Sequence, residues 1–73
     1  SRRGAALLAG RLDFPPARRA MEALETLEPT RPREALLHAL GNGVAFHNAD
    51  LSPEERQIVE QAFRDGEALA MVS

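Results

Sequence analysis

The sequence predicts a small α/β unit with about four helices and two short parallel strands, in which most residues are helical. Three observations support this prediction. Apolar residues recur at helical spacing in the first half, a capping box opens a further helix near Ser52, and short apolar runs stand on both sides of that helix. The order helix, strand, helix, strand in the second half is typical of a parallel α/β layer.

The first half is expected to form three helices. The first covers residues 2–12 and ends at residues 13–16, because proline lacks an N–H donor and restricts the residue before it. The second helix is expected to carry Pro16 in its first turn and to end at Pro29. The third is expected in the segment of residues 30–40, with Pro32 near its start, and a Gly-Asn-Gly turn stops it.

The second half is expected to form a strand, a helix and a second strand. Residues 44–46 are a short apolar run between turn residues, which favours a buried strand. Ser52 at the N-cap, Pro53 at N1 and Glu55 at N3 then predict a capped helix. Residues 67–72 (EALAMV) are predicted to be the second strand. The apolar face of the helix is expected to hold Ile58, Val59, Ala62 and Phe63.

Length and composition exclude several classes of protein. A chain of 73 residues forms one domain at most and has too small a core for a large composite active site. The chain has no cysteine and two histidines, which excludes a disulfide framework and argues against a zinc site. Glu54, Glu55 and Glu60 do not point at one place on a helix and have no nucleophile beside them, so no catalytic or metal-binding residue is expected.

The charge is unevenly distributed. All nine basic residues are arginine, and residues 1–33 have seven Arg against four acids, a net charge of +3. Residues 34–73 have two Arg against seven acids, a net charge of −5. The first half therefore has the charge to contact phosphate, although Arg and Glu on helices usually form a solvated face. No apolar run is long enough to cross a bilayer, so no membrane association and a cytoplasmic location are expected.

Residues 43–73 resemble the second RecA-like domain of superfamily two helicases, closest to the Ski-two-like and related DEAD/DEAH-box enzymes. The matching positions begin with Phe46-His47-Asn48-Ala49-Asp50-Leu51 and continue through Glu55-Arg56, Val59-Glu60, Phe63-Arg64 and Gly66. In that family the same register holds a strand ending in aromatic-His, a loop, a capped helix and a further strand. Asn48 and Asp50 replace a His and a Gly of better-known members, which points to a sub-branch.

The resemblance also implies a division of the chain. Ser1-Arg2-Arg3 and the helix after it, residues 1–13, resemble the Ser-Arg motif and helix of the same domain. Residues 14–42 correspond to a variable helical insertion, and residues 43–73 to the strand-helix-strand core. Two strands make an incomplete parallel sheet, so the chain is expected to be a truncated part of that domain.

For function, the resemblance implies part of an ATP-dependent helicase that tracks single-stranded DNA or RNA. Ser1, Arg2, His47 and Asn48 correspond to positions expected to contact nucleic acid. The parent enzyme would use ATP and Mg²⁺, bound with the help of its remaining domains. No GxxxxGK[ST] phosphate loop occurs in this sequence, so the chain alone is expected to bind no cofactor and to be inactive, with possible self-association.

Two alternative functions remain open from the sequence. One is a free-standing helical protein-interaction module, and the other is a regulatory nucleic-acid-binding fragment that uses the Arg-rich first half. His47 is also open to a purely structural role beside an apolar strand. Asn48 and Asp50, which precede a helix, are suited to forming a turn.

Overall fold

The computed structural model describes residues 14–73, which form three helices and two strands. The helix expected over residues 2–12 lies outside the described residues. The mostly helical composition with two strands agrees with an α/β fragment. The elements are α2 (Arg18–Glu25), α3 (Arg33–Gly41), β1 (Val44–Phe46), α4 (Pro53–Arg64) and β2 (Ala70–Val72).

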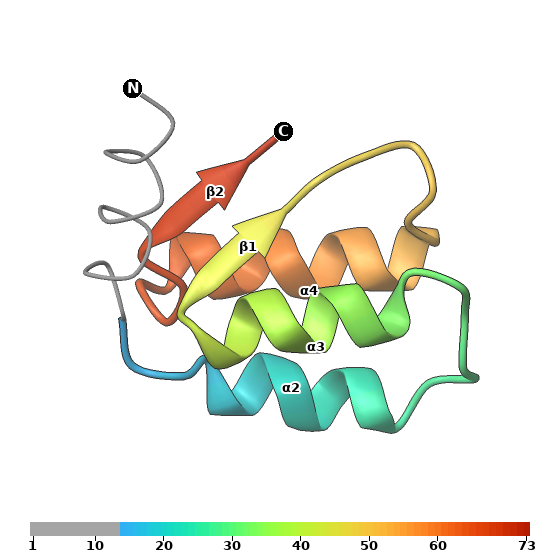
Figure 1. Cartoon of the computed structure of the whole chain (residues 1–73), viewed down its shortest axis with the longest axis horizontal. Coiled ribbons are helices and arrows are strands. Elements are labelled where there is room, and N and C mark those ends of the chain that lie inside the picture. The colour runs from blue at the N-terminus through green and yellow to red at the C-terminus, as the bar shows by residue number, and fades with distance from the viewer. Residues whose placement is uncertain (1–13) are drawn as a thin grey trace, which may run out of the picture.

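The two strands lie side by side and run in the same direction, which confirms the predicted parallel pair. Val44 pairs with Ala70 and Phe46 with Val72, and α4 makes the connection between the strands. Helices α3 and α4 pack against β1, and α2 packs against α3 and α4 (Figure 1). The described helices therefore form layers beside a narrow two-stranded sheet.

A small aliphatic core holds these layers together. Leu36, Leu40 and Val59 are fully buried, and Ala45 of β1 is buried between the sheet and the helices. Burial of such side chains is the main favourable contribution to folding. The complete core is Ala17, Ala20, Leu24, Leu36, Leu40, Ala45, Leu51, Val59, Ala62 and Ala68.

Helix α2 begins two residues later than the sequence predicts. Its N-cap is Ala17, which has no side chain able to cap, and Pro16 lies outside the helix. The carboxylate of Glu67 supplies the cap instead, because it accepts hydrogen bonds from the backbone N–H groups of Arg19 (2.8 Å) and Ala20 (3.0 Å). The start of α2 is therefore set by a residue far along the chain, which local sequence patterns do not reveal.

Helix α3 begins at Arg33 with Pro32 as its N-cap, which agrees with the helix start predicted near Pro32. Thr30, which lies before this helix, donates its hydroxyl hydrogen bond to the carboxylate of Glu55 on α4. This contact fixes the loop before α3 to the first turn of α4.

The second strand is shorter than the predicted residues 67–72, because it covers only Ala70–Val72. Glu67 caps α2, and the N–H of Ala68 returns to the carbonyl of Ala62 (3.0 Å) at the end of α4. The N–H of Leu69 donates to the carbonyl of Gly43 (2.8 Å). The segment before β2 therefore closes the end of α4 and joins the turn before β1.

Phe63 is not on the buried face of α4, contrary to the sequence prediction. It is 46% exposed, whereas the buried positions of α4 are Glu55, Val59 and Ala62. These three residues follow helical spacing of four and three, and Phe63 lies one position beyond that stripe. Ile58, also predicted on the face, is partly buried at its edge.

The capping box predicted at the start of α4 is present. The Oγ of Ser52 accepts from the N–H of Glu55 (3.1 Å), and the N–H of Ser52 donates to the Glu55 carboxylate (2.8 Å). Glu55 is only 2% exposed. Burial of its carboxylate raises its pKa, but the hydrogen bonds from Thr30 and Ser52 together outweigh that effect and hold the pKa below its ordinary value.

This lowered pKa predicts that acid destabilises the fold through Glu55. Because the folded-state pKa lies below the unfolded one, the stabilisation is complete above the ordinary pKa of glutamate, about 4.3, and is lost as the pH falls through the folded value. The urea midpoint should therefore decrease more steeply in this range for the parent than for Glu55→Gln, which keeps the shape but cannot titrate. Parallel pH profiles for the two proteins would contradict this prediction.

Candidate nucleic-acid interface

The loop at the carboxyl end of β1 carries the two predicted contact residues that lie within the described part of the chain. His47 directly follows β1, and its N–H donates to the carbonyl of Val72 (2.9 Å), so the strand pairing continues one residue further. Because β1 and β2 are parallel, their carboxyl ends meet at this edge, where α/β sheets place ligands.

The imidazole of His47 lies against a carboxylate from α4. Its Nε2 is 3.1 Å from Oε2 of Glu60, and the two side chains are 34% and 48% exposed. Nε2 itself is covered and makes no aligned hydrogen bond, so the contact is close in distance but off the N–H direction. Glu60 is half-exposed, so a small rotation of its carboxylate would align the two groups.

Asn48 forms the turn that leads from β1 to α4. Its Oδ1 accepts from the N–H of Asp50 (2.9 Å), and its carbonyl accepts from the N–H of Leu51 at 3.4 Å. This is the turn role that the sequence suggests for these polar residues. The side chain of Asn48 is exposed, and its Nδ2 makes no hydrogen bond with any described residue, so a donor remains for a ligand.

The start of α4 is less open to anions than the helix dipole alone suggests. The Ser52 and Glu55 capping box uses the N–H groups of both residues, and Pro53 has none. Asp50 and Glu54 add exposed acids to the same region. The capping box therefore leaves the start of α4 poorly suited to an anion.

The other two predicted contact residues, Ser1 and Arg2, lie outside the described residues. Arg3, which belongs to the same Ser-Arg motif, lies outside them as well. The structure therefore brings together His47 and Asn48 of the predicted set.

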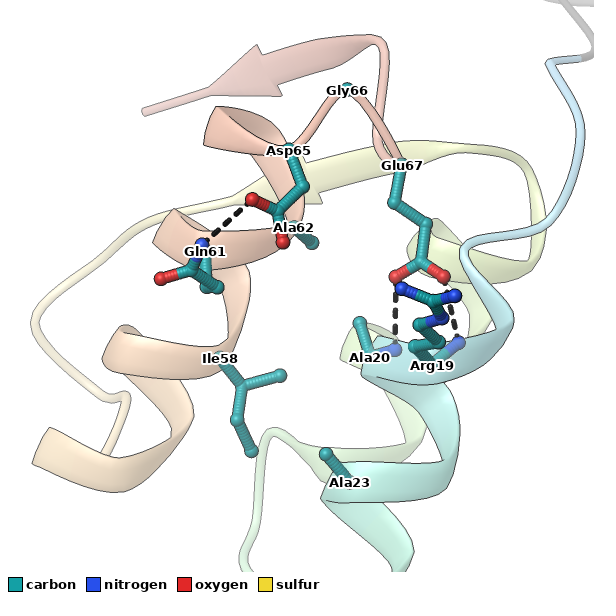
Figure 2. A pocket seen from close by; sticks show the side chains of 9 residues that line it. All are labelled: Arg19, Ala20, Ala23, Ile58, Gln61, Ala62, Asp65, Gly66 and Glu67. Carbon is teal, nitrogen blue, oxygen red and sulfur yellow. Dashed lines mark hydrogen bonds between the residues drawn. The ribbon is translucent and has the colours of Figure 1, made fainter.

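A groove of about 460 Å³ lies between α2 and α4, away from the loop after β1 (Figure 2). Its apolar wall includes Ala20, Ala23, Ile58 and Ala62. Three of its polar side chains already make hydrogen bonds: Gln61 donates to Asp65 (2.8 Å), and Glu67 caps α2. The groove thus has no arrangement of nucleophile and base that could perform catalysis.

In residues 14–73 no group of three or more His, Cys, Asp or Glu side chains is arranged to hold a metal ion. None of the helices described for this chain has the length and hydrophobicity to span a membrane.

Sequence reasoning missed three contacts of functional or structural weight. Glu60 against His47, Glu67 on α2 and Thr30 against Glu55 each join residues from separate elements. Of the three, only Glu60 could be noticed in the sequence, because it is one of the positions that match the helicase register. It follows buried Val59 on a predicted helix. The other two depend on how the layers pack.

The chain is similar to part of several DNA helicases. It is 46% identical to the ATP-dependent DNA helicase Hel308 of Thermococcus kodakarensis over 55 residues, which is 75% of this chain and 5% of the relative. It is 47% identical over 49 residues to the Pyrococcus horikoshii protein of the same name, covering 67% of this chain and 7% of the relative. The Methanocella arvoryzae protein of that name is 58% identical over 31 residues, 42% of this chain and 4% of the relative.

The chain thus spans only 5 to 7% of the length of the first two relatives. No protein-family model matches the sequence. No solved structure matches it. The resemblance predicted from the sequence is confirmed in its coarser form: the chain is similar, over most of its length, to a segment of Hel308 helicases, which supports its interpretation as a helicase fragment.

Proposed function

We propose that this chain forms part of the DNA-contacting surface of the second motor domain of an ATP-dependent DNA helicase. The observation that carries the proposal is the similarity to Hel308 proteins, 46% over 55 residues. The parallel pair β1–β2, joined through α4, is compatible with a parallel sheet of such a domain. His47 and Asn48 stand at the edge of that sheet where ligands bind in α/β folds.

In this proposal the contacts position a single strand and carry little sequence information. Asn48 offers an exposed amide, and Arg2 supplies a guanidinium suited to a phosphate. ATP and Mg²⁺ belong to the parent enzyme, because no phosphate loop is present in these 73 residues. The isolated chain should therefore show no DNA-stimulated ATP hydrolysis above a blank without protein.

The test uses a chimera in which this chain replaces the matching segment of the Thermococcus kodakarensis helicase. Asn48→Ala should weaken binding of a single-stranded oligonucleotide several-fold with little change in salt dependence, since loss of a neutral donor costs about 1 kcal/mol. Arg2→Ala should weaken it more, by about 1.5–3 kcal/mol. It should also reduce the slope of log affinity against log salt by nearly one unit. Fluorescence anisotropy at several salt concentrations measures both quantities.

Two matched controls separate the site from general effects. Arg18→Ala removes the same charge from the exposed start of α2, and Asn42→Ala removes an amide at the opposite end of β1. Both should bind DNA like the unsubstituted chimera. If Arg2→Ala and Asn48→Ala also bind like it, these residues are structural and the proposed surface is wrong.

One observation favours a second candidate, a module that binds another protein. Phe63, Leu69 and Val72 are 46%, 53% and 56% exposed, and large exposed apolar side chains are common at contact surfaces. The remaining domains of a helicase would cover such residues equally well. A chimera that folds but does not unwind DNA would favour the module.

A further inference from the structure

The groove between α2 and α4 is hollow because small side chains line it. Ala20 and Ala23 of α2 lie about one helical turn apart on one wall. Ile58 and Ala62 of α4 have the same spacing on the other wall. Figure 2 shows Ala23 and Ile58 pointing into the space between the two helices. Three alanines fill little of that space, which leaves about 460 Å³ open along an apolar floor.

The two rims of the groove carry charges of opposite sign. Arg19 stands on the α2 side and Asp65 on the α4 side, and both residues are exposed. Within residues 14–73 neither of them forms an ion pair. Glu67, the other acid beside the groove, is already engaged with the N–H groups at the start of α2. A segment seated on the apolar floor would therefore have a cation on one side and an anion on the other.

We propose that this groove seats a helix from another part of the parent helicase, packed across α2 and α4 as a third helix. The apolar face of that helix carries large side chains three or four residues apart, which fill the alanine-lined floor. A carboxylate on one flank meets Arg19, and an arginine or lysine on the other flank meets Asp65, so the charges fix its orientation. The inference rests on one part of the proposed function, that the chain is a piece of a longer helicase.

Two observations favour an occupant from the same polypeptide. The chain spans 5 to 7% of the first two relatives, so a parent of that kind has over nine-tenths of its length elsewhere. A helix on the same polypeptide has a high effective concentration, so a shallow groove with one charge on each rim is enough to hold it. The groove also lies away from the loop of His47 and Asn48, so the seated helix leaves the proposed DNA surface open.

Thiol labelling of the helicase chimera tests whether the groove is covered. Gln61→Cys places a thiol on the groove wall. Gln57→Cys is the matched control, because Gln57 is the same residue type, equally exposed, one turn earlier on α4 and outside the groove. The rate of reaction with N-ethylmaleimide is followed by mass spectrometry and divided by the rate in the unfolded protein. Gln61→Cys should react several-fold more slowly than Gln57→Cys, and equal rates would overturn the inference.

Photo-cross-linking identifies the occupant. A benzophenone maleimide attached to the Gln61→Cys thiol is irradiated in the folded chimera, and the cross-linked peptide is sequenced by mass spectrometry. We expect a peptide from outside the 73-residue insert, with apolar residues at helical spacing between an acid and a base. A peptide from residues 1–13 of the insert, or a covalent dimer of the chimera, would show that a different segment fills the groove and the inference is wrong.

Reversal of one rim charge tests the orientation of the seated helix. Arg19→Glu should speed labelling of Gln61→Cys several-fold, because it places a carboxylate against the carboxylate of that helix. Arg18→Glu makes the same charge change one residue earlier on α2, outside the groove, and should leave the rate unchanged. Both variants gain equally from the positive end of the helix dipole, so their difference reports on the groove. A change in both variants, or in neither, would contradict the assigned contact.

DNA binding separates this inference from the proposed function. If Arg2→Ala and Asn48→Ala weaken oligonucleotide binding while Gln61→Cys labels as fast as Gln57→Cys, the DNA surface stands and the groove inference is wrong. If Gln61→Cys is protected and neither Arg2→Ala nor Asn48→Ala changes binding, the seated helix stands and the proposed DNA surface fails.

Discussion

Replacement of Gly43 by alanine should unfold most of the chain. Gly43 has φ of +73°, a left-handed conformation that disfavours any side chain, and it is buried between two segments. An added Cβ would lie 2.7 Å from the carbonyl oxygen of Pro15 and closer still to Cβ of Phe14. Strain and overpacking together should cost about 2–4 kcal/mol, which is comparable to the whole stability of a domain this small.

The chain contains two matched controls for this substitution. Gly66 has nearly the same φ, +76°, but no atom lies within 4 Å of its added Cβ, so Gly66→Ala should cost only the backbone strain. Gly41 is the last residue of α3, and its added Cβ meets only Met21 at 3.8 Å, so Gly41→Ala should be neutral or stabilising. Urea unfolding followed by circular dichroism ranks the three. Equal midpoints for Gly43→Ala and Gly66→Ala would show that the contact with residues 14 and 15 is not important.

Leu40→Ala should have a similarly large effect. The side chain of Leu40 is fully buried, in the layer between β1 and α2, and its removal leaves a cavity that the small alanine side chains of this core cannot fill. The expected loss is about 2–5 kcal/mol. The same urea titration measures it, as a reduced midpoint and lost helical signal.

Leu69→Ala provides the comparison, since Leu69 is 53% exposed. Its truncation should change the free energy of unfolding by no more than about 0.5 kcal/mol. A midpoint for Leu40→Ala that equals that of Leu69→Ala would contradict the core assigned to this chain.

The sequence predicted those elements whose signals are local. Ser52, Pro53 and Glu55 define the start of α4 by themselves, and the structure has the same capping box. The parallel order followed from the apolar runs on both sides of that helix. The predicted buried face of α4 is confirmed at Val59 and Ala62 and wrong at Phe63, because a periodic pattern does not say where the edge of the buried face lies.

The wrong predictions concern helix and strand ends that are set by contacts between residues far apart in the sequence. The start of α2 was placed too early, because a proline marks where a helix is allowed to begin but not which partner satisfies its first N–H groups. Glu67 was assigned to the second strand because its hydrogen bonds to the start of α2 join residues far apart in the sequence. In the candidate site, His47 and Asn48 come from the match to the helicase register and stay predictions, whereas the contact of Glu60 with His47 depends on how α4 packs against β1.

The cap that Glu67 places on α2 also determines how the molecule opens to solvent. The first amides of a helix have no acceptor within the helix, so those of Arg19 and Ala20 are protected from hydrogen exchange by a carboxylate 47 to 48 residues away. Their exchange with deuterium therefore reports on departure of the segment after α4, even while α2 stays wound. The two helices share one opening event, and a protease that cuts near Gly66 would release the start of α2.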